Sequence, residues 1–182
     1  MADSPSRTPS DEADARQLAM ALAEGDAYQR SLDYMAQEVA DNGGKKRAGD
    51  YIVAYAQERA EGMYHLDGKG ELVWMEPGDE NCHIEISVCD AADHRFIPGL
   101  DIEVTLTPEK GERIGPFKVE FLWHPGLYHY GRNVKLPGDG EYTIGITIAP
   151  PTFMRHDKVN GQRYAKAVEV RFEHVAVKTG RE

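Results

Sequence analysis

The chain has few cysteines: only Cys82 and Cys89 occur among its 182 residues. Both lie on one predicted strand, and seven residues of strand span roughly 23 Å, which is far beyond the reach of a disulfide. We therefore predict two free thiols, as is typical of proteins in a reducing compartment such as the cytoplasm.

Long hydrophobic runs are also lacking. No window approaches the roughly 18 apolar residues that a membrane-spanning helix needs. The N-terminal stretch MADSPSRTPSDEADARQ is polar and acidic, without a basic start followed by an apolar segment. The chain as written therefore predicts no signal peptide and a cytoplasmic location.

Positive charge is scarce. The chain has 21 Lys and Arg against 31 Asp and Glu, which gives a formal net charge of −10. Such a surface repels phosphate groups and attracts cations, so nucleic acid and anionic membranes are not expected as partners. With 41% hydrophobic residues, the composition is that of a globular protein that can bury a core.

Motifs for covalent catalysis and for phosphate binding are absent. The sequence contains no G-x-S-x-G, no P-loop and no G-x-G-x-x-G. No catalytic residue is therefore predicted.

The amino-acid composition and the spacing of apolar residues divide the chain into three parts. Residues 1–10 are rich in Ser and Pro and are predicted to be a disordered tail. Residues 11–48 have apolar residues mostly at helical spacing and predict a helical N-terminal arm. Residues 49–182 contain short runs rich in Val, Ile, Thr and aromatic residues and predict a single β domain.

Individual residues predict where the helix of the arm begins and ends. Ser10 is the expected N-cap, Asn42-Gly43-Gly44 is the expected stop, and Gly25 could divide the arm into two helices. The basic triplet Lys45-Lys46-Arg47 is expected to be a solvated turn.

Alternating apolar residues predict the strands of the β domain. The runs CHIEISVCD, LDIEVTL, FKVEFLW and EYTIGITIA all alternate, and a last strand is expected near residues 166–177, with a bulge at His174. The segment YIVAYAQERA (51–60) is compatible with either a helix or a strand. Several short alternating strands predict a mainly β, antiparallel sandwich.

The alternation also predicts which way the polar side chains point. If Ile84 and its in-phase neighbours face the core, His83 and Glu85 project together from the other face, roughly 7 Å apart at the backbone. One metal ion can span that distance. An isolated His-x-Glu on a strand is nevertheless more often an ordinary solvent-exposed face.

Three more histidines are candidate ligands. His124 and His129 flank the turn in FLWHPGLYHYG, with Phe121 and Trp123 expected in the core and His124 on the opposite face. His156 lies in a loop after a strand end. Each alone is typical of a solvated histidine. Together with one carboxylate, the imidazoles favour Cu(II), Fe or Zn over Ca²⁺ and Mg²⁺.

The order of the motifs adds a resemblance to a known family. HIEISV, RFIPGLDIEV, FLWHPGLYHYGRNV and GDGEYTIGITIAPPTFMRHD together resemble the periplasmic iron-transport accessory family over roughly residues 50–178. Members of that family are small immunoglobulin-like sandwich proteins that bind copper and iron beside a high-affinity iron permease. The most specific pieces are His83-x-Glu85, Ile97-Pro98, His129-Tyr130-Gly131 followed by Asn133, Gly140-x-Tyr142, Pro150-Pro151 and Arg155-His156.

The resemblance implies a copper site made of His83, Glu85, His129 and His156. The family also has a methionine on the strand before His-Tyr-Gly, and this chain offers His124 as its substitute. Replacing a thioether with an imidazole favours Cu(II), Zn or Fe over Cu(I). Met63 is a looser match to a second family methionine.

The resemblance also concerns assembly and location. It implies a homodimer with the metal near the subunit interface. The family is secreted or lipid-anchored, whereas this chain shows no signal, and the helical arm is extra to the family pattern.

The predicted function is non-catalytic metal binding in iron transport or metal handling, with a copper or iron ion, or zinc, held by the histidines and Glu85. A possible partner is an iron permease. Two alternatives stay open. One is a non-haem metal enzyme, whose pocket Trp123, Tyr128 and Tyr130 could line. The other is an interaction module in which the helical arm docks a partner.

Overall fold

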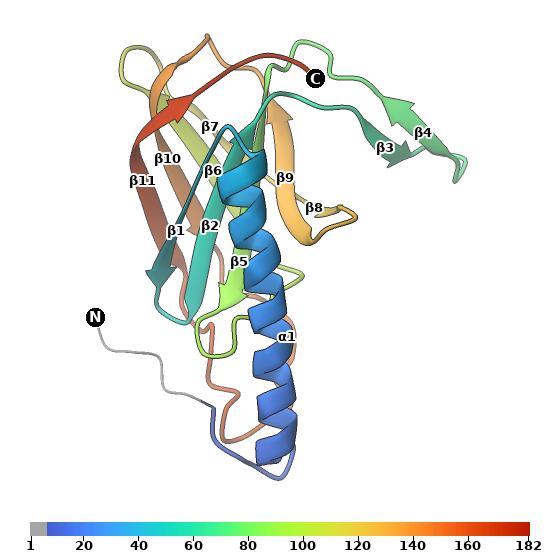
Figure 1. The fold of residues 1–182 in the computed structure, drawn as a ribbon, viewed down its shortest axis with the longest axis vertical. Helices are drawn as coiled ribbons and strands as arrows, with labels where there is room; N and C mark the ends of the chain where they lie inside the picture. The colour runs from blue at the N-terminus through green and yellow to red at the C-terminus, as the bar shows by residue number, and fades with distance from the viewer. Residues whose placement is uncertain (1–6) are drawn as a thin grey trace.

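The computed structural model describes residues 7–182. Two antiparallel sheets pack face to face, and helix α1 (Ala15–Tyr34) runs along the outer face of one of them (Figure 1). The predicted mainly β sandwich with an N-terminal helix is thereby confirmed. None of the helices in this part of the chain is long and apolar enough to cross a membrane.

The sheet under α1 has five strands in the order β1-β2-β5-β9-β8, all antiparallel to their neighbours. Its central strand, β5, is the run that carries the His-x-Glu motif. The strands are β1 (Asn42–Ala48), β2 (Tyr51–Glu58), β5 (Cys82–Asp90), β9 (Tyr128–Val134) and β8 (Glu120–Trp123).

The second sheet has four strands in the order β11-β10-β6-β7. The predicted bulge at His174 is confirmed, because φ is +59° there and the register between β10 and β11 shifts next to it. A separate hairpin, β3–β4, projects from the sandwich (Figure 1). These strands are β11 (Val168–Val177), β10 (Gly140–Ile148), β6 (Ile102–Pro108), β7 (Ile114–Lys118), β3 (Met63–Leu66) and β4 (Leu72–Met75).

The alternating residues fill the space between the sheets as predicted. Ile84, Ile86 and Val88 of β5 are fully buried in one core with Ile144 and Ile146 of β10. Cys82 joins this core, whereas Cys89 points to the other face of β5, where the side-chain amide of Gln29 on α1 lies 3.4 Å from its sulfur. Both cysteines are free thiols, as predicted.

The expectation of one strand over residues 117–123 was wrong. The chain crosses from one sheet to the other at Val119, so that β7 and β8 belong to different sheets. Phe121 keeps the core-side phase, because it pairs with Tyr130 of the core and its ring contacts that of Tyr130. β8 is the edge strand of its sheet, however, so Phe121 and Trp123 are 52% and 72% exposed and do not lie in the core.

The helical arm also differs in detail from the prediction. Asp14, not Ser10, caps α1, through a capping box with Gln17. Gly25 does not divide the helix. It lies where α1 crosses the turn after β5, and a Cβ atom there would come within 1.9 Å of the carbonyl oxygen of Asp93. The glycine therefore permits close packing and is not a break.

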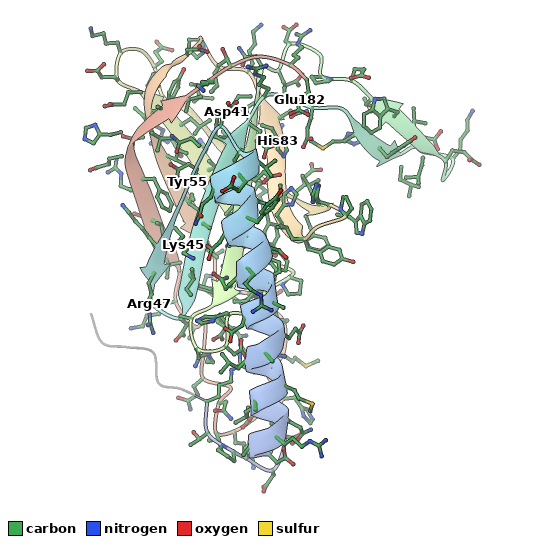
Figure 2. The ribbon with its side chains drawn as sticks, viewed as in Figure 1. Asp41, Lys45, Arg47, Tyr55, His83 and Glu182 are labelled. Carbon is green, nitrogen blue, oxygen red and sulfur yellow. The ribbon has the colours of Figure 1, made fainter. Side chains whose placement is uncertain are left out.

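The C-terminal end of the arm is not a basic turn. After a short π-helical turn, η1 (Met35–Val39), the chain forms β1, and Lys45-Lys46-Arg47 pair with residues 52–54 of β2. Figure 2 shows Lys45 and Arg47 along this edge strand. Residues 51–58 of the ambiguous segment 51–60 form the strand β2, and its β-branched and aromatic residues pack between β1 and β5.

The start of the described chain is held in place. Arg7 forms ion pairs with Asp90 and Asp93, at 2.9 and 3.0 Å, and Thr8 exchanges hydrogen bonds with Asn160. Residues 7–10 of the predicted tail are therefore ordered. The rest of that tail lies outside the described residues.

Candidate metal centre

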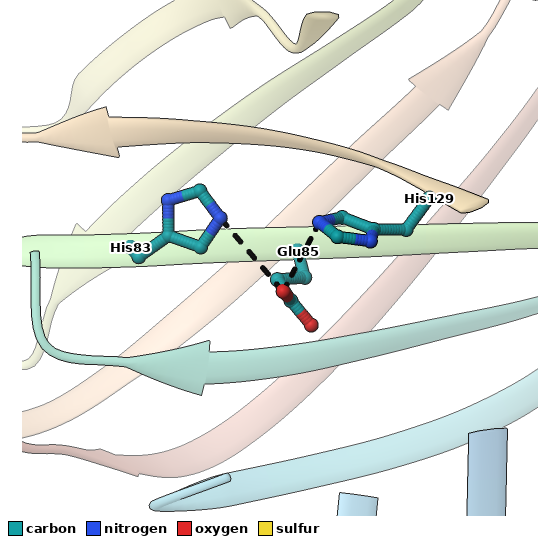
Figure 3. Close-up of side chains that lie close together, drawn as sticks. All are labelled: His83, Glu85 and His129. Atoms are coloured by element: carbon teal, nitrogen blue, oxygen red, sulfur yellow. Dashed lines mark ion pairs between the residues drawn. The ribbon is translucent and has the colours of Figure 1, made fainter. Parts of the chain in front are cut away.

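His83, Glu85 and His129 form a compact cluster, the triad, at the outer face of the five-stranded sheet (Figure 3). One ligand atom of each lies within 4.8 Å of those of the other two. Nε2 of His129 is 3.1 Å from a carboxylate oxygen of Glu85, and Nε2 of His83 is 3.9 Å from the same oxygen.

The strand pairing brings these three side chains together. His83 and Glu85 are two residues apart on β5 and so share a face, as the alternation predicted. The register places Glu85 opposite Gly131 on β9, and His129 is two residues before Gly131 and therefore on the same face. Adjacent antiparallel strands thus bring together residues that are more than 40 positions apart in the sequence.

The triad is buried, which overturns the alternative of an ordinary solvent-exposed face. His83 is 0%, His129 5% and Glu85 7% exposed. Buried polar groups need partners, yet Nε2 of His83 and both ring nitrogens of His129 have no hydrogen-bond partner among the described residues. Unpaired ring nitrogens beside a carboxylate are what a metal site requires.

Gly131 makes room for the ring of His83. A Cβ atom at Gly131 would lie 2.9 Å from Nε2 of His83 and 2.8 Å from a methyl carbon of Leu122. Only glycine leaves this space open. The glycine of the His-Tyr-Gly motif therefore has a steric role at the triad.

Asn133 orients His83. Its Oδ1 lies 3.0 Å from Nδ1 of His83, and because an amide oxygen only accepts hydrogen bonds, Nδ1 must carry the proton. Nε2 is then the free lone pair, and it points toward Glu85. Metal-binding histidines are commonly fixed in this way by a partner on the second nitrogen.

Burial and neighbouring charges set the ionisation of the triad. Burial raises the pKa of Glu85, but the close approach of Nε2 of His129, at 3.1 Å, and the charges of the neighbouring histidines outweigh it, so the pKa lies below its ordinary value. Burial lowers the pKa of His83. The geometry therefore favours an ionised carboxylate beside a neutral imidazole, which are the forms that bind metals.

Helix α1 and the neighbouring strands exclude water from this face. The hydroxyl of Tyr28 on α1 donates to the carbonyl oxygen of Tyr128 at 2.5 Å and lies 3.0 Å from the hydroxyl of Ser87. Ser87 follows Glu85 on the same face of β5. The helix therefore covers the strand immediately beside the triad.

The other predicted ligands are not part of the triad. His124 is near the triad, with its ring centroid 6.2 Å from that of His129, and its Nδ1 accepts a hydrogen bond from the backbone of Gly126. His156 is 91% exposed and forms an ion pair with Glu12 at 2.9 Å. Met63 lies on β3, opposite Met75. Within one chain, the structure does not bring His156 together with the triad.

Two acidic residues near the triad were missed by sequence reasoning. Glu58 is the last residue of β2 and pairs with His83 across the ladder. Glu61 follows it, with a carboxylate oxygen 3.5 Å from Nε2 of His83. Both lie in or next to the segment whose secondary structure the sequence left open, so no pattern placed them beside the histidines.

Comparison with solved structures identifies relatives of the same fold. FetP from uropathogenic Escherichia coli strain F11 is 22% identical over 74% of this chain and 93% of its own, with a TM-score of 0.60. Copper-reconstituted P19 from Campylobacter jejuni is 16% identical over 77% and 96%, with a TM-score of 0.64. A copper-bound variant of FetP is similar as well, 22% identical over 75% and 95%, with a TM-score of 0.59.

A search of curated proteins found no match. The sequence model of a protein family described as "Fe2+ transport protein" matches residues 69–176, from the β3–β4 hairpin to β11. The matched range includes all three residues of the triad and excludes α1. Because this range is more than half of the chain, the chain belongs to the Fe2+ transport protein family.

Proposed function

We propose that this protein binds one copper or iron ion through His83, Glu85 and His129 and acts, without catalysis, in iron transport. The observation that carries the proposal is the unpaired Nε2 of His83, fully buried and aimed at a carboxylate. Two imidazoles and one carboxylate suit Cu(II), Fe and also Zn. Relatives of the same fold, FetP and P19, have been crystallised with copper.

Binding is favoured over the alternative of a metal enzyme. An enzyme needs a pocket beside its metal that can enclose a substrate. A cavity of about 790 Å³ exists, but it lies between the turn after β5 and the loop at residues 152–154, and no residue of the triad lines it. Of the three residues that could have lined a pocket under the alternative, Trp123 and Tyr128 are exposed and Tyr130 is buried in the core.

A homodimer is part of the proposal. The β3–β4 hairpin and the β8–β9 hairpin expose large apolar side chains, among them Leu66 at 70%, Leu72 at 67% and Trp123 at 72%. Contiguous exposed apolar surface is typical of an interaction site. In such a dimer the exposed His156 would exchange its partner Glu12 for the triad of the second copy, whereas His124 lies at the edge of its own triad. Sedimentation velocity should find a dimer, and a monomer would contradict this part of the proposal.

The strand order supports an immunoglobulin-like sandwich. β2-β5-β9-β8 faces β11-β10-β6, which corresponds to the ABED and GFC arrangement, and two strands are added at the edges, β1 beside β2 and β7 beside β6. Tyr142, near the start of β10, donates its hydroxyl hydrogen to the carbonyl oxygen of Gly138, as the tyrosine corner of such domains does.

The proposal extends to the transport partner and the location of the protein. We propose an iron permease as its transport partner and a location outside the cytoplasm, where its relative FetP was produced recombinantly. Both thiols are fully buried, so an oxidising compartment would leave them unpaired.

Titration of metal-free protein with Cu²⁺ and with Fe²⁺ tests the metal site. We expect one ion per chain for the wild type and none for the His83→Ala/His129→Ala double variant. His174→Ala is the matched control, because His174 is exposed and pairs only with Glu141. Unchanged stoichiometry in the double variant would refute the assignment.

A further inference from the structure

A second carboxylate, that of Glu61, lies near the same nitrogen of His83 as Glu85 does. Glu61 lies in the connection from β2 to β3, and its oxygen is 3.5 Å from Nε2 of His83. The side-chain amide of Asn133 donates to the backbone oxygen of Glu61 at 2.7 Å. The same asparagine therefore holds both His83 and Glu61 in position.

The charges around Glu61 are not balanced by basic side chains. Three carboxylates gather near His83: Glu58 is its partner in the β2–β5 ladder, and oxygens of Glu61 and Glu85 lie 3.5 and 3.9 Å from its Nε2. Figure 2 shows Glu182 at the same end of the molecule as His83. Within residues 7–182, neither Glu58 nor Glu61 forms an ion pair with a lysine or arginine. A bound cation would supply the missing positive charge.

An acidic cluster alone does not make a site, but the unpaired nitrogen of His83 points into this one. Nε2 is fully buried and has two carboxylates nearby, with Glu61 at 3.5 Å and Glu85 at 3.9 Å. Two ligands of one tetrahedral ion, each about 2.1 Å from it, are about 3.4 Å apart. The separation of Glu61 and His83 matches this value.

We propose that Glu61 is a further ligand of the ion, so that the site offers two imidazole nitrogens and two carboxylate oxygens. This inference rests on the proposed function and specifies its metal preference. The carboxylate of Glu61 is not within 4.8 Å of all three ligand atoms of the triad. Its side chain is 33% exposed, however, and can turn toward the ion. Oxygen donors favour Fe²⁺ over the soft ion Cu⁺, which prefers sulfur.

The test compares two substitutions at one position. Glu61→Gln keeps the shape and removes the charge, whereas Glu61→Met replaces the oxygen donor with a thioether. Glu71→Gln, on the exposed connection between β3 and β4, is the matched control. Anaerobic competition titrations with Fe²⁺ and with Cu⁺ give both affinities, and thermal unfolding of the metal-free variants checks that each one folds.

We expect Glu61→Gln to weaken Fe²⁺ binding by at least ~10-fold and Cu⁺ binding much less. Glu61→Met should strengthen Cu⁺ binding and bring a sulfur neighbour into the X-ray absorption spectrum of bound copper. Wild-type affinity for Fe²⁺ in both variants, with one ion still bound, would overturn the role of Glu61 and leave the triad intact. A wild-type protein that binds neither ion would overturn the proposed function itself.

Discussion

Asn133 and His83 face each other across β9 and β5, with Oδ1 of the amide 3.0 Å from Nδ1 of the imidazole. The contact fixes the tautomer of His83 and directs its free nitrogen toward Glu85. Asn133, which is not one of the proposed ligands, therefore determines that Nε2 and not Nδ1 of His83 can bind a metal ion.

Asn133→Ala should weaken metal binding by about 10–100-fold, because the ring of His83 loses its orientation and its tautomer. Asn133→Asp keeps an oxygen that accepts the hydrogen bond and should retain most of the affinity. Isothermal titration calorimetry with Cu²⁺ measures both. Asn160→Ala, which removes an asparagine far from the triad, should bind like the wild type, and an equal loss there would contradict an orienting role for Asn133.

Gly131→Ala should remove metal binding and lower the free energy of unfolding by about 1–3 kcal/mol, because the new methyl group collides with His83 and Leu122. Gly145→Ala on β10 is the control, since a Cβ atom there meets nothing closer than 3.8 Å. Urea unfolding gives the stability and a Cu²⁺ titration gives the binding. Full binding by Gly131→Ala would show that the ring does not need this space.

Asp90 should make the stability depend on pH. Burial raises its pKa, but hydrogen bonds from Tyr164 and the backbone of Ala92, with the charges of Arg163 and Arg7, outweigh burial and hold the pKa below 3.8. The folded state then binds this proton less readily than the unfolded state. The stabilisation is present above the ordinary pKa of aspartate and is lost as the pH falls through the lowered value.

Asp90→Asn should therefore lower the free energy of unfolding at pH 7 by about 3–5 kcal/mol, because it removes the buried negative charge that Arg7 and Arg163 share. The free energy of unfolding of the variant should also decrease less than that of the wild type as the pH falls. Urea unfolding between neutral pH and pH values below 3.8 tests both effects. The same acid sensitivity in wild type and variant would place its origin elsewhere.

Gly25→Val should lift α1 from the turn after β5, since even one added carbon would lie 1.9 Å from the oxygen of Asp93. Cys89, fully buried beside Gln29 of α1, should then react with a thiol reagent, while Cys82 in the core stays protected. Thiol labelling followed by mass spectrometry distinguishes the two. Met20→Ala, at an exposed position of the same helix, should leave Cys89 unreactive, and labelling of both cysteines in Gly25→Val would indicate general unfolding.

The amino-acid sequence alone determined the strands of the sandwich and the face from which His83 and Glu85 project. Alternation is sufficient for this, because successive side chains of a strand point to opposite sides wherever the strand lies. The motif order also identified the family before any coordinates.

The tertiary structure decided what covers that face. Periodicity says nothing about distant segments, so it could not show that α1 and the β2–β3 connection exclude water from the triad or that Glu61 lies beside His83. It also could not show that the chain changes sheets at Val119, or that β8 is an edge strand on which Phe121 and Trp123 stay exposed. A polar strand face and a buried metal centre have the same local pattern, and only the packing of residues far apart in the sequence distinguishes them.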